Sequence, residues 1–418
     1  MSPPSRPNLL ASPRGRKLLF GSLYFSEGAP IGFLWLYLPK RLASEGMAVG
    51  PVSTLLATLA LFWSFKFVWG PLVDGWRSPR WTLKSWVLSM QLLMGLALVP
   101  LVWLDPVADF RLLFILLCLH ALAAAIQDAS IDALSIASTP LDERGAVNGW
   151  MQVGMLLGRS LFGGVALMLA AHLGGHIVAC ALIGAIWCTS LLLLLAADAR
   201  HLAPMDTAHQ SRWADHMHAL NAAFRRRTTW LGLGFALIGG MAYEAVGGVR
   251  GHYLTDRGFS DEQVGLFFAV YVTGSWLLGS LAGGYLADRM GRRRSVAVFL
   301  LCCIGVVLLL AGADTFLDLR ESRICLALLS VLYFCIGMFI ASSYALFMDL
   351  TDDRLGATQF SAFMGATNGC EAIALSCVGR LIPQVGFAGA FTIMAVASLI
   401  ALPLLYWMPS TNRAVIRA

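Results

Sequence analysis

The chain has 418 residues, of which 58% are apolar and only 13% are charged, and its mean hydropathy is +0.72. A water-soluble protein of this length needs a more polar surface, because water contacts most of its helices. The composition therefore excludes a single soluble core and predicts a protein embedded in a membrane. The net charge of +6 does not indicate a nucleic-acid partner, because the positive residues gather in loops on one predicted side of that membrane.

The first 17 residues are polar and carry positive charges directly before the first apolar run. That run is too long for the apolar region of a signal peptide, and it lacks a small-residue cleavage site. We expect it to be the first membrane span, retained in the mature protein, with the N-terminus in the cytoplasm.

Apolar runs of about 20 residues, each able to cross a bilayer core of about 30 Å, recur along the chain. The predicted spans are residues 18–39, 51–73, 82–104, 110–136, 146–170, 175–197, 228–254, 262–287, 295–312, 323–348, 357–382 and 385–408. With the N-terminus inside, and with charges near the ends of a span counted with the adjacent loop, 20 of the 30 Lys and Arg residues lie on the cytoplasmic side and seven on the other side. This excess supports the twelve spans and places both termini in the cytoplasm.

A polar segment, residues 198–227, divides the chain nearly in half. It holds four histidines and ends with Arg225, Arg226 and Arg227. The histidines lack the spacing of metal ligands, and the nine cysteines lie in apolar runs, so no metal site or cofactor is predicted. We interpret the segment as a cytoplasmic linker between domains 1–197 and 228–418, with a short interfacial helix over 211–223.

The two halves resemble each other at a nearly constant offset. The matching segments are 70–74 with 284–288 (214 residues apart), 142–146 with 352–357 (210 apart), and the surroundings of Glu27 and Glu244 (about 216 apart). Duplicated six-span halves around a midplane cavity are a recurring transporter plan. The predicted fold is therefore all-α, with twelve transmembrane helices in two pseudo-symmetric six-helix bundles.

The sharpest motif is Gly284-x-Leu286-Ala287-Asp288-Arg289-x-Gly291-Arg292-Arg293, after the eighth span. A carboxylate at a helix end can pair with arginines or with the positive N-terminus of a neighbouring helix, and glycines permit the tight turn. The motif closely resembles the loop signature of the major facilitator superfamily. It predicts a gating latch of Asp288, Arg289, Gly291 and Arg292 that closes the cytoplasmic side in one state. The first-half copy, beginning at Asp74, is degenerate and is expected to latch less well or differently.

Two further stretches resemble the muropeptide permease and acetyl-CoA transporter family of that superfamily. They are Lys66-Phe67-Val68-Trp69-Gly70-Pro71-Leu72-Val73-Asp74 and Gln127-Asp128-Ala129-Ser130-Ile131-Asp132. Members of this family are typically longer, with extra spans. The compact chain is more similar to the siderophore permeases of the pyochelin and rhizobactin type, a similarity that implies a siderophore as solute.

Ionisable residues inside the spans are the best site candidates, because a charge in hydrocarbon is costly and is usually functional. Glu27, Glu244 and Glu371 lie near mid-depth and are predicted to bind protons or solute. The resemblance implies that Glu27 and Glu244 face the cavity. Arg159 is a candidate anchor for an anionic solute. Tyr37 and Tyr243 would suit an aromatic or acyl solute, with packing inside the bundle as the alternative role.

Lys66 lies in the second span, and Asp128 and Asp132 lie one helical turn apart on one face of the fourth. A pair between Lys66 and Asp128 would leave neither charge alone in lipid. The sequence leaves open whether this network relays protons or only joins helices.

We find no phosphate-binding Gly-x-x-x-x-Gly-Lys-[Ser/Thr] loop and no Gly-x-Ser-x-Gly elbow, so we predict that the chain is not an enzyme. We predict a monomeric secondary transporter of the inner membrane, which takes up a bulky solute with protons. A ferric siderophore is the first candidate solute, followed by a muropeptide or an acyl-CoA-type compound. Efflux and a receptor that binds without transport remain alternatives. The expected partners are the solute, protons and membrane lipid.

Overall fold

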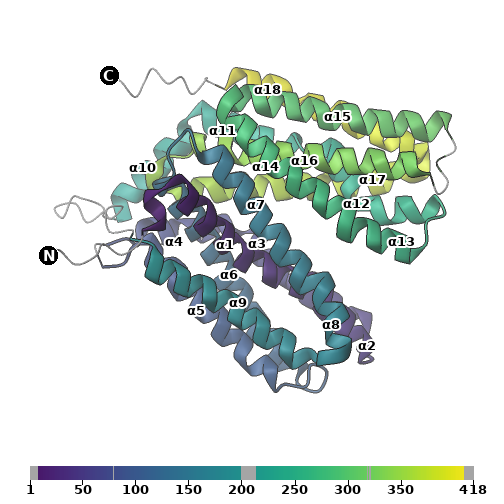
Figure 1. Cartoon of the computed structure of the whole chain (residues 1–418). Coiled ribbons are helices and arrows are strands. Elements are labelled where there is room, and N and C mark those ends of the chain that lie inside the picture. The colour runs from purple at the N-terminus through teal and green to yellow at the C-terminus, as the bar shows by residue number, and fades with distance from the viewer. Residues whose placement is uncertain (1–7, 79, 199–212, 318, 320–321, 409–418) are drawn as a thin grey trace. The chain divides into compact units, whose positions relative to one another are not determined.

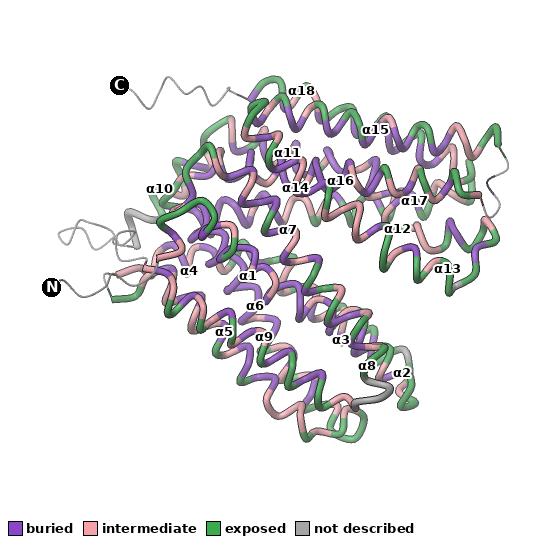
Figure 2. Tube along the Cα trace, in the orientation of Figure 1, coloured by how far each residue is buried: buried purple, intermediate pink, exposed green. Residues whose placement is uncertain are grey.

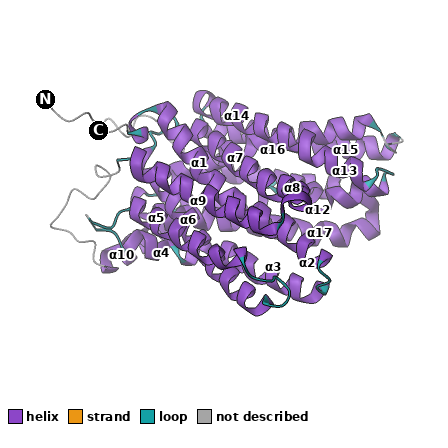
Figure 3. Ribbon diagram, turned by 60° about the horizontal axis from the view of Figure 1, so that its bottom comes forward, coloured by secondary structure: helices purple, strands orange, loops and turns teal. Residues whose placement is uncertain are grey.

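The structure is a computed structural model that describes all residues except 1–7, 79, 199–212, 318, 320–321 and 409–418. The described residues form helices joined by short loops, with no strand among them (Figures 1 and 3). The all-α prediction is thereby confirmed. Part of the predicted linker, residues 199–212, lies outside the described residues, whereas the helix expected near 211–223 is present as α10, Trp213–Arg225.

The helices follow the predicted spans closely. The first-half helices are α1 (Pro13–Gly32), α2 (Leu38–Ser44), α3 (Val49–Ser64), α4 (Gly70–Gly75), α5 (Leu83–Leu98), α6 (Phe110–Ser138), α7 (Arg144–Ser160), α8 (Ala166–Leu173) and α9 (Gly175–Ala196). The second-half helices after α10 are α11 (Arg227–Ile238), α12 (Met241–Asp256), α13 (Asp261–Leu266), α14 (Thr273–Met290), α15 (Arg292–Phe316), α16 (Arg323–Leu350), α17 (Gly356–Leu399) and α18 (Ala401–Trp407). Single π-helical turns join α1 to α2, α7 to α8 and α13 to α14.

Nine helical segments of the described chain are long and apolar enough to cross a membrane, and the bent pair α3–α4 makes a tenth. The last of the nine, Asp353–Trp407, contains two predicted spans, because Gly386 interrupts α17 with a φ of 70°. The first predicted span is also helical, although Glu27 and its N-terminal positive residues make it more polar. Together these segments account for the twelve predicted spans. The ninth span, predicted as 295–312, is longer in the structure, where α15 covers Arg292–Phe316.

The chain forms two compact units. Unit 1 comprises Met1–Glu143, Trp150–Leu220 and Asp353–Ser361, and unit 2 comprises Arg144–Gly149, Asn221–Asp352 and Ala362–Ala418. Two short segments belong to a different unit from the rest of their half of the chain. The start of α7 belongs to unit 2 and the start of α17 belongs to unit 1, and these two segments overlap the repeated segments 142–146 and 352–357.

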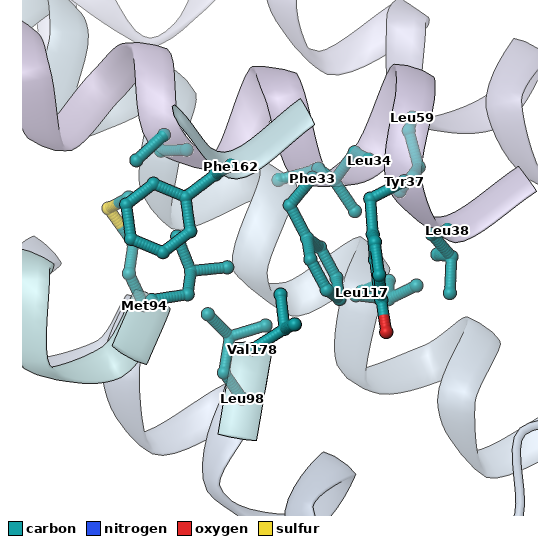
Figure 4. Close-up of a cluster of buried hydrophobic side chains, with 14 of the residues drawn as sticks. Phe33, Leu34, Tyr37, Leu38, Leu59, Met94, Leu98, Leu117, Phe162 and Val178 are labelled. Carbon is teal, nitrogen blue, oxygen red and sulfur yellow. The ribbon is translucent and has the colours of Figure 1, made fainter. Parts of the chain in front are cut away.

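The core of unit 1 is an apolar cluster contributed by most of its helices (Figure 4). Phe33 and Tyr37 stack with their ring centroids 5.2 Å apart, and Leu117 and Phe162 pack in the same cluster. Buried residues recur along the helices within each unit and alternate with exposed ones (Figure 2). Many exposed side chains are large and apolar, such as Leu36 and Leu195, as expected where a helix faces lipid.

Helices α1 and α7 pack backbone against backbone within unit 1. A Cβ atom on Gly154 would lie 1.9 Å from the carbonyl oxygen of Gly21, and one on Gly28 would lie 2.1 Å from that of Met155. Small residues allow such close approach between membrane helices. Only glycine fits at these two positions, so this contact positions α1, which carries Glu27.

Candidate functional site

The second span is broken where its charged residue lies. Helix α3 ends at Ser64, a 3-10 turn covers Lys66–Val68, and α4 begins at Gly70, with a bend of 45° between the two helices. Pro71 explains the break, because a proline has no N–H and its ring clashes with the carbonyl four residues earlier. At the bend, the Lys66 side chain is only 6% exposed.

Lys66 contacts both aspartates of α6. Its Nζ atom lies 2.6 Å from Asp128 Oδ2 and 3.9 Å from Asp132 Oδ2, and the carboxylates are 3% and 0% exposed. The Tyr24 hydroxyl of α1 donates a hydrogen bond to Asp132 Oδ1. The Lys66 ammonium group thus joins the bend of the second span to α6, and Asp132 in turn joins α6 to α1.

Glu27, one turn further along α1 than Tyr24, faces the same residues. It is buried and interacts electrostatically with Asp128, Lys66 and Asp132. Its Oε2 atom has no hydrogen-bond partner among the residues that the structure describes. We call Tyr24, Glu27, Lys66, Asp128 and Asp132 the charge cluster. It holds three carboxyl groups and one cation.

Uncharged polar side chains form a second buried network in unit 1. Gln91 of α5 donates to Ser26 Oγ at 3.0 Å and to Thr189 Oγ1 at 3.2 Å, and Ser190 donates to Gln91 Oε1 at 2.7 Å. Gln127 donates to Ser26 at 3.4 Å. Our sequence interpretation quoted Gln127 as part of a family stretch but missed the other residues of this network and Tyr24. An amide in the middle of an apolar span, as at Gln91, was the available signal.

Two predicted site residues of unit 1 lie elsewhere. Tyr37 is buried in the apolar cluster of Figure 4, where its hydroxyl accepts a hydrogen bond from Arg41 at 3.3 Å. The Arg159 side chain is exposed on α7. Neither residue is among the contacts of the charge cluster described above.

Unit 2 carries a smaller polar group. Glu244 of α12 interacts electrostatically with Glu371 of α17 and with Arg250, whose guanidinium lies 5.1 Å from the centre of the Phe268 ring. Glu244 is half-buried and Glu371 is exposed. Tyr243 is buried edge-on against Phe339, with the ring centroids 5.6 Å apart.

In unit 2, the predicted latch residue Asp288 binds the start of α7. Its carboxylate accepts hydrogen bonds from the N–H groups of Gly145 at 2.9 Å and Ala146 at 2.7 Å. Arg292 Nη1 lies 2.6 Å from Asp288 and its Nε lies 3.1 Å from Asp349. A carboxylate at a helix N-terminus is favourable because the first N–H groups of the helix have no partner within it.

The other predicted latch residues have different surroundings. Gly291 has a φ of 87°, which permits the sharp turn from α14 into α15. Arg289 lies over the Tyr285 ring, 4.3 Å from its centre. Arg144 pairs with Asp349 at 3.2 Å, and neither of these residues was predicted to belong to the latch.

In unit 1, Asp74 makes the equivalent contact with the start of α17. It accepts hydrogen bonds from the N–H groups of Ala357 at 3.1 Å and Thr358 at 2.7 Å, from Thr358 Oγ1 at 2.7 Å, and from Arg77. Although the sequence motif around Asp74 is degenerate, its carboxylate has at least as many partners as that of Asp288. The Thr358 hydroxyl, which sequence reasoning missed, supplies the additional bond.

The family model of the Major Facilitator Superfamily matches residues 18–250 and 238–418. The chain belongs to the Major Facilitator Superfamily. The anhydromuropeptide permease of Escherichia coli (strain K12) is 26% identical over 384 residues, which cover 89% of this chain and 73% of the relative. The putative transporter AmpG 4 of Rickettsia conorii is 21% identical over 395 residues, covering 91% of this chain and 94% of the relative. The superfamily and the permease resemblance expected from the sequence are confirmed.

Solved structures show the same fold. The fucose:proton symporter FucP of E. coli superposes with a TM-score of 0.73 at 12% identity, covering 94% of this chain and 98% of that one. A bacterial homologue of the iron transporter ferroportin superposes with a TM-score of 0.70 at 18% identity, covering 93% and 98%. Its membership of the Major Facilitator Superfamily and its permease relatives make the protein a polytopic membrane transporter of a small-molecule solute.

Proposed function

We propose that this transporter takes up a bulky solute together with protons, across the inner membrane, with both of its termini in the cytoplasm. The charge cluster is the observation that carries the proposal. Three carboxyl groups share one ammonium group, and all four side chains are buried. Unpaired charges are very costly in such a place.

Charge balance explains how the cluster would hold a proton. Lys66 neutralises one carboxylate, and Asp128 is its nearest partner at 2.6 Å. The charges of Asp132 and Glu27 would then remain unbalanced, and an unbalanced charge is costly at a buried site. Glu27 Oε2 and Asp132 Oδ2 both lack a hydrogen-bond partner among the described residues, but Asp132 also accepts a hydrogen bond from Tyr24 and lies 3.9 Å from Lys66 Nζ. We infer that Glu27 takes up and releases the coupling proton and that Lys66 and the two aspartates set its charge environment.

The aspartates at the helix starts support alternating access. Asp74, from the first half of the sequence, binds the start of α17 in the second half. Asp288, from the second half, binds the start of α7 in the first half. These contacts consist of hydrogen bonds and ion pairs, which can break and reform without disturbing an apolar core. We infer that they act as two latches at the cytoplasmic ends of the helices.

For the solute, we propose an anhydromuropeptide-like sugar peptide. Two relatives that match about nine-tenths of this chain support this class, one of them an anhydromuropeptide permease. The Rickettsia relative is covered over 94% of its length, so a compact chain also occurs among proteins that bear the AmpG name. Chain length therefore no longer favours a siderophore, whose uptake stays an untested prediction.

The test uses the full chain in proteoliposomes with a pH-sensitive dye inside. Adding an anhydromuropeptide outside should produce solute uptake and a simultaneous proton influx. Glu27→Gln should retain binding of the solute and lose the proton influx. Glu262→Gln is the matched control, because this exposed carboxylate lies on α13, far along the chain from the charge cluster. It should behave as the unchanged protein.

Three outcomes would contradict the proposal. Uptake without proton movement would exclude the coupling, and binding without flux in either direction would indicate a receptor. Uptake of a ferric siderophore but not of the anhydromuropeptide would overturn the solute class and leave the coupling intact.

A further inference from the structure

Unit 2 has a groove that the transport proposal does not use. It has a volume of about 670 Å³ and lies between the start of α15 and helix α18, which pack against each other (Figure 1). Its lining includes Arg293, Arg294, Ala297, Leu402, Tyr406 and Trp407. Two arginines thus stand beside a wall that is otherwise apolar and aromatic.

The arginines of the groove are distinct from the latch arginine. Arg292 is buried against Asp288 and Asp349. Arg293 is half-buried, donates a hydrogen bond to the Tyr406 carbonyl oxygen and lies 5.9 Å from the centre of the Tyr406 ring. A guanidinium carries five N–H donors, so this bond leaves others for an anion. Arg294 is exposed.

The aromatic residues place the groove at a membrane surface. Tyr406 is 76% exposed and Trp407 is 57% exposed at the end of the last helix. Such amphipathic rings gather at the level of the lipid headgroups. With the orientation proposed above, this surface is the cytoplasmic one, where anionic lipids create a negative potential.

We propose that this groove binds one anionic phospholipid. Arg293 and Arg294 would contact the phosphate, and an acyl chain would lie along Leu402 and Ala297. A phospholipid joins an anionic headgroup to a long apolar tail. The two arginines complement the headgroup, and the apolar wall of the groove complements the tail. No acidic residue lines the groove in the described part of the chain.

The experiment measures lipid binding to the full chain by native mass spectrometry. The protein is taken from nanodiscs of phosphatidylcholine that contain increasing amounts of phosphatidylglycerol. One phosphatidylglycerol should be retained per chain, and Arg293→Gln/Arg294→Gln should weaken its binding about 30-fold, since each arginine near an anionic headgroup contributes about fivefold. The matched control is Arg225→Gln/Arg227→Gln, which removes the same charge from two exposed residues. It should retain the lipid with less than about a threefold change.

A second variant keeps both arginines and fills the groove. Ala297→Trp should also release the lipid, which diffuse attraction to surface charge would not predict. The proposal would be overturned if phosphatidylcholine were retained as well as phosphatidylglycerol. It would also be overturned if both arginine double variants weakened lipid binding equally, or if Ala297→Trp left lipid binding unchanged. Competition by inorganic phosphate at millimolar concentration would show a site for free anions instead of a lipid. Transport is not part of this readout, so failure here leaves the proposed function untouched.

Discussion

The two partners of the buried ion pair should not be equivalent when each is removed. Lys66→Met leaves Asp128, Asp132 and Glu27 without their cation, whereas Asp128→Asn leaves Lys66 with a second carboxylate already 3.9 Å away. Loss of one partner of a buried pair costs about 3–5 kcal/mol when the other charge stays unpaired. We expect this cost for Lys66→Met.

For Asp128→Asn the expected cost is smaller. Lys66 can move towards Asp132, and the new asparagine still offers an oxygen, so the loss resembles that of one hydrogen bond to a charged group, about 1.5–3 kcal/mol. In the double variant Lys66→Met/Asp128→Asn, one carboxylate disappears together with the ammonium group. Its cost should therefore fall short of the sum of the single costs by about 1 kcal/mol or more.

The assay is reversible unfolding of the purified protein in mixed micelles, with increasing dodecyl sulfate and tryptophan fluorescence as the signal. The free energy of unfolding is compared for the unchanged protein, the two single variants and the double variant. An equal cost for both single variants, or a larger cost for Asp128→Asn, would refute the reasoning that Asp132 serves as a reserve partner.

Two further predictions concern the latches and the helix contacts. Asp74→Asn should lower the free energy of unfolding by about 1.5–3 kcal/mol, because it removes the negative charge to which Ala357, Thr358 and Arg77 donate. Thr358→Val should lower it by only about 1 kcal/mol, because it removes one hydroxyl donor. Equal losses for the two variants in the same micelle assay would contradict this order. Gly154→Ala should destabilise the protein by about 1–3 kcal/mol, because its Cβ would lie 1.9 Å from a backbone oxygen. Gly184→Ala is the control and should be neutral or slightly stabilising, because its Cβ would meet no neighbouring atom within 4 Å.

Much of the fold could be predicted from the sequence, because lipid imposes a simple rule on it. Every span must be apolar and long enough to satisfy its own backbone hydrogen bonds, so hydropathy alone located the helices within a few residues. Hydropathy did not reveal the bend inside the second span, which begins just before Pro71, whereas the break at Gly386 falls within a few residues of the predicted boundary between the last two spans. The repeated segments around Asp74 and Asp288 also predicted the superfamily, since both copies retain the carboxylate at the end of a helix.

The sequence by itself established a membrane transporter of paired six-span halves, and it singled out Lys66, Asp128 and Asp132 as costly charges that need one another. Only the tertiary structure decided which neutral residues bond to the buried carboxylates: Tyr24 on α1 donates to Asp132, and Thr358 at the start of α17 donates to Asp74. The physical reason is distance along the chain. Tyr24 lies 108 residues from Asp132 and Thr358 lies 284 residues from Asp74, and a hydroxyl carries no signal of its partner until folding brings the two together.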